Sequence, residues 1–131
     1  MKLGQVAELV KAKVLCGVEQ LDREVSRAFA ADLLSDVLAM VQEEGVLLIT
    51  GNVAPQVIRV AEVMNVGAVL FVRGKYPNES SVQYAAEAGI PLLATDKIMF
   101  ETCGILYAQG LLPAQRKRLP KENDAGHRTH L

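Results

Sequence analysis

Aromatic residues, cysteines and long apolar runs are scarce in this sequence, and each shortage excludes a class of protein. Aromatic side chains make up 5% of the 131 residues and tryptophan is absent, which argues against a base-stacking surface for single-stranded nucleic acid. Two cysteines cannot build a disulfide framework or a four-cysteine metal site. No apolar run approaches the roughly 20 residues that span a bilayer, and charge interrupts the first residues too early for a signal peptide. We therefore expect a reduced, cytoplasmic protein without membrane contact.

Histidine and the common catalytic motifs are also missing from the main part of the chain. The sequence contains no phosphate-binding loop, no dinucleotide-binding glycine turn and no nucleophile elbow. Its two histidines, His127 and His130, lie near the C-terminus without a third metal ligand close by. Cys16 and Cys103 stand in apolar segments without a basic neighbour, which is typical of small buried side chains rather than nucleophiles. We expect neither an enzyme, nor a metal site, nor a cofactor.

The charge is nearly balanced overall but is unevenly distributed. The chain has 14 Lys and Arg against 15 Asp and Glu, a net charge of −1, which disfavours a strongly basic nucleic-acid binder. Residues 1–112 are acidic, whereas residues 113–131 are basic and contain almost no apolar side chains. We predict one domain at 1–112 and a basic, disordered tail at 113–131. The alternative is a basic arm that contacts an acidic partner or nucleic acid.

The main positive signal is an alternation of buried-strand and helical segments. Half of the residues are hydrophobic, and continuous apolar runs occur at 46–50, 68–72 and 91–95. Such runs are typical of strands covered on both faces. A segment with helical spacing follows each of them, and units of this βαβ kind give parallel strands with right-handed crossovers. We therefore predict a small three-layer α/β domain with a mostly parallel sheet.

The remaining elements are assigned by spacing and by their end signals. Asp32, Asn78 and Asp96 stand where side chains that cap helices are expected, and Gly89 is a suitable helix end. Residues 13–31 should add one or two further strands, with an antiparallel edge strand as one arrangement. The expected helices cover residues 3–12, 33–42, 56–65, 79–88 and 97–109.

Polar and basic residues follow the three predicted parallel strands. Because ligands of parallel sheets bind beyond the carboxyl ends of the strands, these residues should share one edge, which we call the strand-end rim. Helix N-termini there would offer unpaired N–H groups and partial positive charge to a small anion, such as the phosphate of a nucleotide. The alternative is that the same residues only cap helices and turn the chain. The rim comprises Thr50, Gly51, Asn52, Arg73, Gly74, Lys75, Thr95, Asp96 and Lys97.

A second polar cluster precedes the first of these strands. It contains Asp22, Arg23, Asp32, Ser35 and Asp36, and its plain interpretation is helix capping with a surface ion pair. The same residues carry a family resemblance. Asp-Arg at the start of the cluster and Ala-Asp-Leu-Leu-Ser-Asp at its end resemble the motif of the DRTGG domain family, and the similarity extends over residues 1–112.

One part of that motif is changed in this sequence. The Thr-Gly-Gly of the family is replaced by Ser26, Arg27 and Ala28. Glycine lets a ligand approach the backbone closely, so the side chains of Arg27 and Ala28 would obstruct a ligand that required the two glycines.

The resemblance implies a regulatory role rather than a catalytic one. DRTGG domains occur beside CBS domains in nucleotide-regulated inorganic pyrophosphatases, ahead of the catalytic domain in some phosphotransacetylases, and as free-standing proteins. In the pyrophosphatases they contribute to dimer contacts. The resemblance therefore implies a homodimer, a nucleotide ligand and a partner enzyme.

Three functions fit these features. The first is a non-catalytic regulatory module that binds a small anionic ligand, such as an adenine nucleotide, and acts as a homodimer. The second is a dimerisation or protein-interaction module without a small-molecule ligand, which the loss of the two glycines favours. The third, which we disfavour, is an enzyme whose general base would be Asp32, Asp36 or Asp96.

Overall fold

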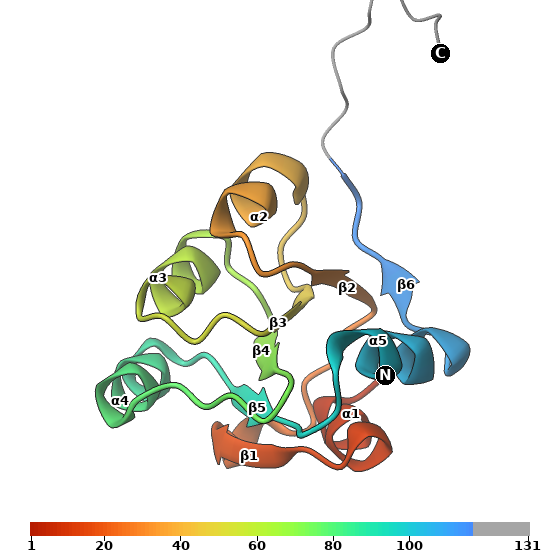
Figure 1. Cartoon of the computed structure of the whole chain (residues 1–131), viewed down its shortest axis with the longest axis horizontal. Helices are drawn as coiled ribbons and strands as arrows, with labels where there is room; N and C mark the ends of the chain where they lie inside the picture. The colour runs from red at the N-terminus through yellow and green to blue at the C-terminus, as the bar shows by residue number, and fades with distance from the viewer. Residues whose placement is uncertain (117–131) are drawn as a thin grey trace, which may run out of the picture.

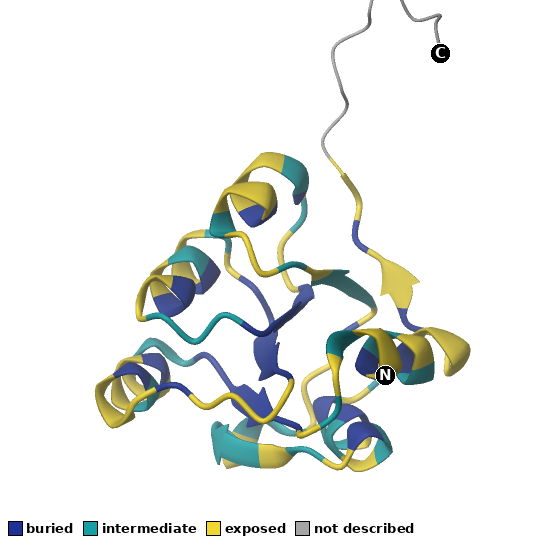
Figure 2. Ribbon diagram, in the orientation of Figure 1, coloured by how far each residue is buried: buried dark blue, intermediate teal, exposed yellow. Residues whose placement is uncertain are grey.

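The three apolar runs form the centre of a six-stranded sheet. In the computed structural model, which describes residues 1–116, they are β3 (Leu47–Thr50), β4 (Ala68–Phe71) and β5 (Leu92–Ala94). Every residue of these strands is buried, because helices cover both faces of the sheet (Figures 1 and 2). β3 pairs with β4, and β4 with β5, in parallel as predicted.

The segment 13–31 supplies two further strands on opposite sides of this centre. β1 (Lys13–Cys16) pairs with β5 as an antiparallel edge strand, and β2 (Arg27–Ala30) pairs with β3 in parallel. A sixth strand, β6 (Leu112–Pro113), pairs in parallel with the outer side of β2. The order across the sheet is therefore β1-β5-β4-β3-β2-β6.

Strand β6 places the first residues of the expected tail on the sheet. The amides of Leu112 and Ala114 donate to carbonyl groups of Ser26 and Ala28 at 3.0 and 2.9 Å, and Ala114 is buried. The predicted boundary after residue 112 thus lies within this strand. The rest of the expected tail, residues 117–131 with both histidines, lies outside the described residues.

Within residues 1–116 five α-helices form the outer two layers (Figure 1). One layer contains α2 (Leu34–Met40), α3 (Gln56–Val63) and α4 (Glu79–Ala88), and the other contains α1 (Leu3–Val10) and α5 (Met99–Ala108). This is the three-layer arrangement that the sequence predicts. None of the helices in this part of the chain is long and apolar enough to cross a membrane.

The pleat of the strands divides the core into two halves. Leu48, Val69 and Phe71 pack towards α2, α3 and α4. Their neighbours along the strands, Leu47 and Leu70 among them, pack towards α1 and α5. Successive side chains of a strand point to opposite faces, so a strand that is apolar at every position is stable only between two helical layers. Each large apolar side chain buried in this way contributes about 1.5–3 kcal/mol.

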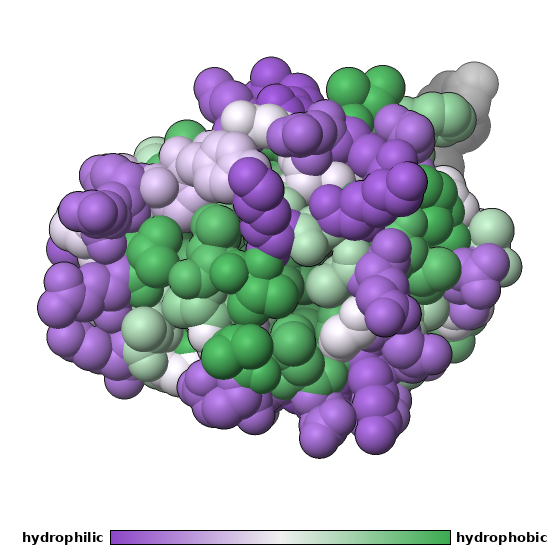
Figure 3. All heavy atoms as spheres, turned by 90° about the horizontal axis from the view of Figure 1, so that it is seen from below, coloured by the Kyte–Doolittle hydropathy of each residue, from purple (hydrophilic) through white to green (hydrophobic). Residues whose placement is uncertain are grey.

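The edge strand β1 is less completely covered than the central strands. Lys13 is exposed and the other three residues of β1 are partly buried. The face at the bottom of Figure 1, which carries β1 and α1, accordingly shows apolar side chains in its middle with hydrophilic residues around them (Figure 3).

The ends of α4 follow the sequence signals. Asn78 is the N-cap residue, and its side-chain oxygen accepts a hydrogen bond from the amide of Ser81 at 2.8 Å. Gly89 closes the helix with a φ of 76°, a left-handed conformation that glycine adopts without steric cost. Both predictions for this helix are confirmed.

The start of α5 differs from the prediction. Asp96 was expected to cap it, but the N-cap residue is Ile98 and the helix begins at Met99. The two preceding residues are held in a loop, because the amide of Arg73 donates to the carbonyl of Lys97 at 2.8 Å. Asp96 therefore belongs to a turn between strand and helix, and its side chain is exposed.

Candidate functional site

The nine predicted rim residues lie in three turns at the carboxyl ends of adjacent strands. The turns follow β3, β4 and β5, which are neighbours in the sheet. Backbone hydrogen bonds join them: the amide of Val72 donates to Thr50 at 3.0 Å, and the amide of Gly74 donates to Thr95, also at 3.0 Å. The strand-end rim is therefore one continuous surface rather than three separate loops.

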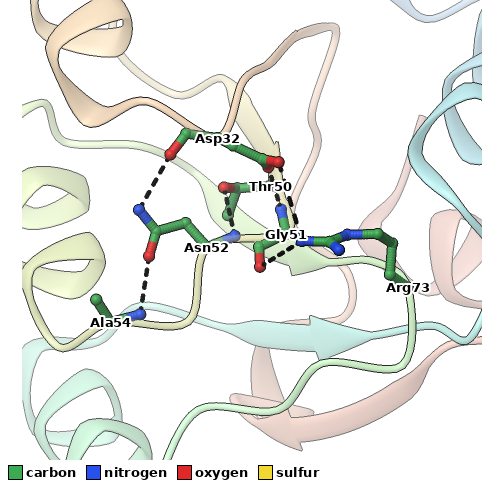
Figure 4. Close-up of polar contacts among 6 residues, drawn as sticks. All are labelled: Asp32, Thr50, Gly51, Asn52, Ala54 and Arg73. Atoms are coloured by element: carbon green, nitrogen blue, oxygen red, sulfur yellow. Dashed lines mark hydrogen bonds and ion pairs between the residues drawn. The ribbon is translucent and has the colours of Figure 1, made fainter.

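The polar side chains of the first turn hold the turn itself. Thr50 is buried, and its hydroxyl accepts a hydrogen bond from the amide of Asn52 at 3.0 Å. The side chain of Asn52 accepts from the amide of Ala54 at 2.9 Å and donates to the carbonyl of Asp32 at 3.0 Å (Figure 4). These contacts fix the chain just before α3. The side chains of Thr50 and Asn52 thus stabilise the backbone of the rim.

Thr95 has a similar internal role in the third turn. Its side chain is buried, and its hydroxyl donates to the carbonyl of Val10 at 2.7 Å and accepts from the amide of Lys97 at 3.2 Å. The end of α1 is thereby joined to the strand-end rim. A buried hydroxyl without such partners would cost free energy, so Thr95 is already satisfied within the protein.

Asp32 joins the rim, although the sequence assigned it to the start of α2. One of its carboxylate oxygens accepts from the amide of Gly51 at 2.7 Å, and the other lies 4.0 Å from Nη2 of Arg73 (Figure 4). The N-cap residue of α2 is Leu33, so the expected capping role is wrong. One signal in the sequence could have placed Asp32 at the rim. Asp32 comes shortly after β2, and because β2 runs parallel to β3, both strands end at the same edge of the sheet.

Arg73 is the rim cation that contacts the turn after β3. Its backbone has a φ of 66°, which is uncommon for a residue with a side chain. Its guanidinium extends over Gly51 and donates to the carbonyl of that residue at 3.5 Å (Figure 4). A Cβ atom at position 51 would lie 2.8 Å from the guanidinium, so glycine is required for this close approach. About half of the Arg73 side chain, 48%, remains exposed.

The other charged rim residues differ in whether they form an ion pair. Lys97 lies 3.5 Å from Glu101 in the first turn of α5. Lys75 and Asp96 are exposed, and within residues 1–116 no ion pair to Lys75 is formed. The structure therefore adds Asp32 and Glu101 to a surface that the sequence predicted to be mainly cationic. Such a mixed surface can offer both cationic partners for a phosphate and carboxylate acceptors for hydroxyl groups.

The residues of the family motif are divided between the two ends of the sheet. Asp22 is exposed, 3.8 Å from Lys2, and Arg23 donates to the carbonyl of Gly67 at 2.8 Å, just before β4 begins. Ser26 also precedes its strand, β2. These three residues therefore lie at the amino ends of the strands, opposite the rim.

The end of the motif lies on the rim side of the sheet, beyond β2. Asp32 is part of the rim, whereas Ser35 and Asp36 are exposed in the first turn of α2. The structure thus joins only one residue of the second polar cluster to the rim.

The two cysteines are unpaired and partly buried. Burial raises the pKa of the Cys16 and Cys103 thiols above the ordinary cysteine value, which lowers the fraction of reactive thiolate at neutral pH. On the outer surface, the hydrogen bond to Glu62 raises the pKa of Tyr84. Among residues 1–116, no three His, Cys, Asp or Glu side chains are grouped so that they could hold a metal ion.

Two comparisons with known proteins identify relatives of this chain. The DRTGG domain matches residues 5–108. The fold resembles a crystal structure of the CBS and DRTGG domains of the regulatory region of Clostridium perfringens pyrophosphatase, complexed with its activator diadenosine tetraphosphate, with a TM-score of 0.68 and 14% identity. That similarity covers 99% of this chain and 61% of the other, so this chain spans about three-fifths of its relative. No curated protein sequence matches.

Proposed function

Because this chain belongs to the DRTGG domain family, we propose that it is a non-catalytic regulatory module that binds a small anionic ligand, such as an adenine nucleotide, at the strand-end rim. In this proposal the module acts as a homodimer in the cytoplasm and regulates a partner enzyme. The related pyrophosphatase region carries a nucleotide activator, which supports a ligand of this class.

The observation that carries the proposal is the position of Arg73. Its half-exposed side chain lies over Gly51, Lys75 stands on the same turn as Arg73, and Lys97 stands on the neighbouring turn after β5. A guanidinium is suited to the planar, two-point recognition of phosphate oxygens.

A second candidate is a dimerisation or protein-interaction module without a small-molecule ligand. The specific observation in its favour is Asp32, which already occupies the amide of Gly51 and lies beside Arg73. An anion would have to displace that carboxylate from both groups. The two candidates therefore differ in whether an anion competes successfully with Asp32.

A thermal-shift panel separates the two candidates. The ligands are ATP, ADP, AMP, diadenosine tetraphosphate and UDP-sugars, with adenosine and inorganic phosphate as controls for the two parts of a nucleotide. A ligand present at 100 times its Kd adds about 2.7 kcal/mol of stability, which raises Tm by several degrees in a domain of this size. We expect a response to at least one nucleotide. No response from the whole panel would leave only the second candidate.

The site is tested with Arg73→Ala. We expect about tenfold weaker binding of the responding nucleotide, close to the 1.4 kcal/mol associated with one strong charged contact, and little change in Tm without ligand because the side chain is half exposed. The matched control is Arg59→Ala on α3, where the arginine is exposed and outside the rim. Equal nucleotide responses in Arg73→Ala and the parent protein would remove Arg73 from the site and, with it, the observation that carries the proposal.

A further inference from the structure

The outer side of α5 is apolar although nothing in residues 1–116 covers it. Phe100 and Tyr107 lie on one side of the helix, two turns apart, and are 86% and 68% exposed. Cys103 and Gly104 lie between them. Large apolar side chains exposed together on one surface are typical of interaction sites, so the exposed side of α5 indicates a missing neighbour.

An apolar hollow of about 330 Å³ lies next to this side of the helix. Its floor is formed by Ala28 and Ala30 of β2, together with Ile49 of β3, and no charged residue lines it. Phe100, Tyr107 and the residues of β6 form its walls. We call it the α5 hollow. It exists because small alanine side chains stand where larger ones would fill the space between sheet and helix.

The nearby edge of the sheet is closed to a further strand. Pro113 has no N–H group, and its carbonyl accepts from the side chain of Arg27 at 3.0 Å. The amide of Gln115 donates to the carboxylate of Glu43 at 2.7 Å. These are devices by which proteins protect edge strands from pairing with another chain. A partner that docks here must therefore use side-chain packing rather than sheet extension.

We propose that a second copy of this chain docks at the α5 hollow, with α5 of each copy against the other. A twofold interface requires a surface that is complementary to itself. The patch meets this requirement because it has a protruding ring, Phe100, directly beside a hollow of matching apolar character. The absence of charge in the hollow removes the repulsion that identical charged surfaces would experience at a twofold axis.

The size of the patch predicts a weak dimer. Phe100 and Tyr107 expose together on the order of 300 Å², because an aromatic side chain carries roughly 150–250 Å². Leu112, which is 48% exposed, and the floor of the hollow extend this area. The total does not exceed the low end of specific interfaces, which is about 600 Å² per partner. The dimer should therefore dissociate on dilution.

This inference rests on the homodimer in the proposed function and gives it a surface next to the ligand site. Ala30 and Ile49 line the α5 hollow, and two residues beyond them along the chain are Asp32 and Gly51, which are in contact at the rim. A docked second copy would thus stand beside the rim. Ligand binding and association would then influence each other reciprocally.

The test is sedimentation of the full chain over a wide concentration range. We expect the parent protein to change from monomer to dimer, and Phe100→Lys to raise the dissociation constant more than tenfold. Its Tm at low concentration should be unchanged because the ring is exposed. The matched control is Val63→Lys, a substitution of a 77% exposed residue on α3, in the other helical layer. It should leave association unchanged.

A second variant removes association without weakening the fold. A Cβ at Gly104 meets no atom within 4 Å in the single copy, so Gly104→Gln should raise Tm of the dilute protein because glycine is unfavourable inside a helix. In the dimer the same side chain would hold the two α5 helices apart. We expect the Gly104→Gln protein to remain monomeric and to have a higher Tm than the dilute parent protein.

The outcomes distinguish this proposal from the ligand site. A parent protein that is monomeric at every concentration, or dimers that persist in both Phe100→Lys and Gly104→Gln, would overturn the α5 interface and leave the hollow for a different protein. The nucleotide thermal shift is measured on Phe100→Lys in the same series. A monomer that still responds to nucleotide supports the rim on its own, whereas a dimer without nucleotide response contradicts only the rim.

Discussion

At the scale of single residues, the contact between Asp32, Gly51 and Arg73 decides how the rim can work. Asp32 accepts the Gly51 amide and lies 4.0 Å from Arg73, with both charged side chains about half exposed. An exposed ion pair of this kind contributes only about 0.2–1 kcal/mol. The carboxylate of Asp32 therefore holds the guanidinium of Arg73 only weakly. A phosphate that makes several charged contacts can compete with it for the guanidinium.

Asp32→Asn tests this competition. The asparagine oxygen can still accept the Gly51 amide, but the negative charge beside Arg73 is removed. We expect the nucleotide that responds in the thermal-shift panel to bind up to about fivefold more tightly, in line with an exposed pair worth 1 kcal/mol or less. Titration calorimetry measures the change.

The control for this experiment is Asp36→Asn, which removes an equal charge from an exposed position in α2. It should change nucleotide affinity little, since exposed charges at a distance are screened by salt. Weaker binding in Asp32→Asn would contradict competition and would indicate that the carboxylate itself contacts the ligand.

The residues of the rim could be predicted from sequence only where their strands were recognisable. The apolar runs reveal the strands that position three of them: Thr50 ends β3, Arg73 lies two residues beyond β4, and Thr95 directly follows β5. Asp32 was missed because β2 contains Arg27 and three partly or fully exposed neighbours, and so lacks a continuous apolar pattern. The contact that holds the buried Thr95 also could not be foreseen, because it is a hydrogen bond to Val10, which lies 85 residues away in the sequence.

At the scale of secondary-structure elements, those with a local apolar pattern were predictable and those held by distant contacts were not. The central strands and the helices between them were predictable because apolar periodicity is a local property of the sequence. β6 was not predictable, because a two-residue strand with exposed side chains leaves only backbone hydrogen bonds as its signal. The late start of α5 depends on the contact between Arg73 and Lys97, which lie far apart in sequence.

The cap of α4 is a testable element. Asn78→Ala removes the oxygen that accepts the Ser81 amide, and loss of an N-cap costs about 1 kcal/mol. We expect Tm to fall by several degrees, as measured by circular dichroism. Ser80→Ala is the control at the same helix end, because Ser80 donates to Asn78 but accepts no helix amide in the described contacts. Equal losses in the two variants would show that the cap does not stabilise α4.

At the scale of the whole molecule, residues 112–116 complete the sheet and the core. A chain that ends at residue 111 would lose β6 and the buried Ala114, and β2 would become an unpaired edge. We expect its Tm to be several degrees below that of the full chain, whereas a chain that ends at residue 116 should melt with the full chain. Calorimetry of the two truncated chains measures both. If the shorter chain melts with the longer one, β6 has no part in stability.

The N-terminal helix and strand pack against elements from late in the described chain. β1 pairs with β5, and α1 packs beside α5, while Thr95 holds the end of α1 from the rim. During synthesis α1 and β1 therefore meet these neighbours only after some ninety further residues have been made. During that interval α2, α3 and α4 can begin to cover their own face of β3 and β4. The apolar side of α1 is not covered by α5 until α5 has been made. A nascent chain interrupted before residue 99 would therefore expose that side to chaperones.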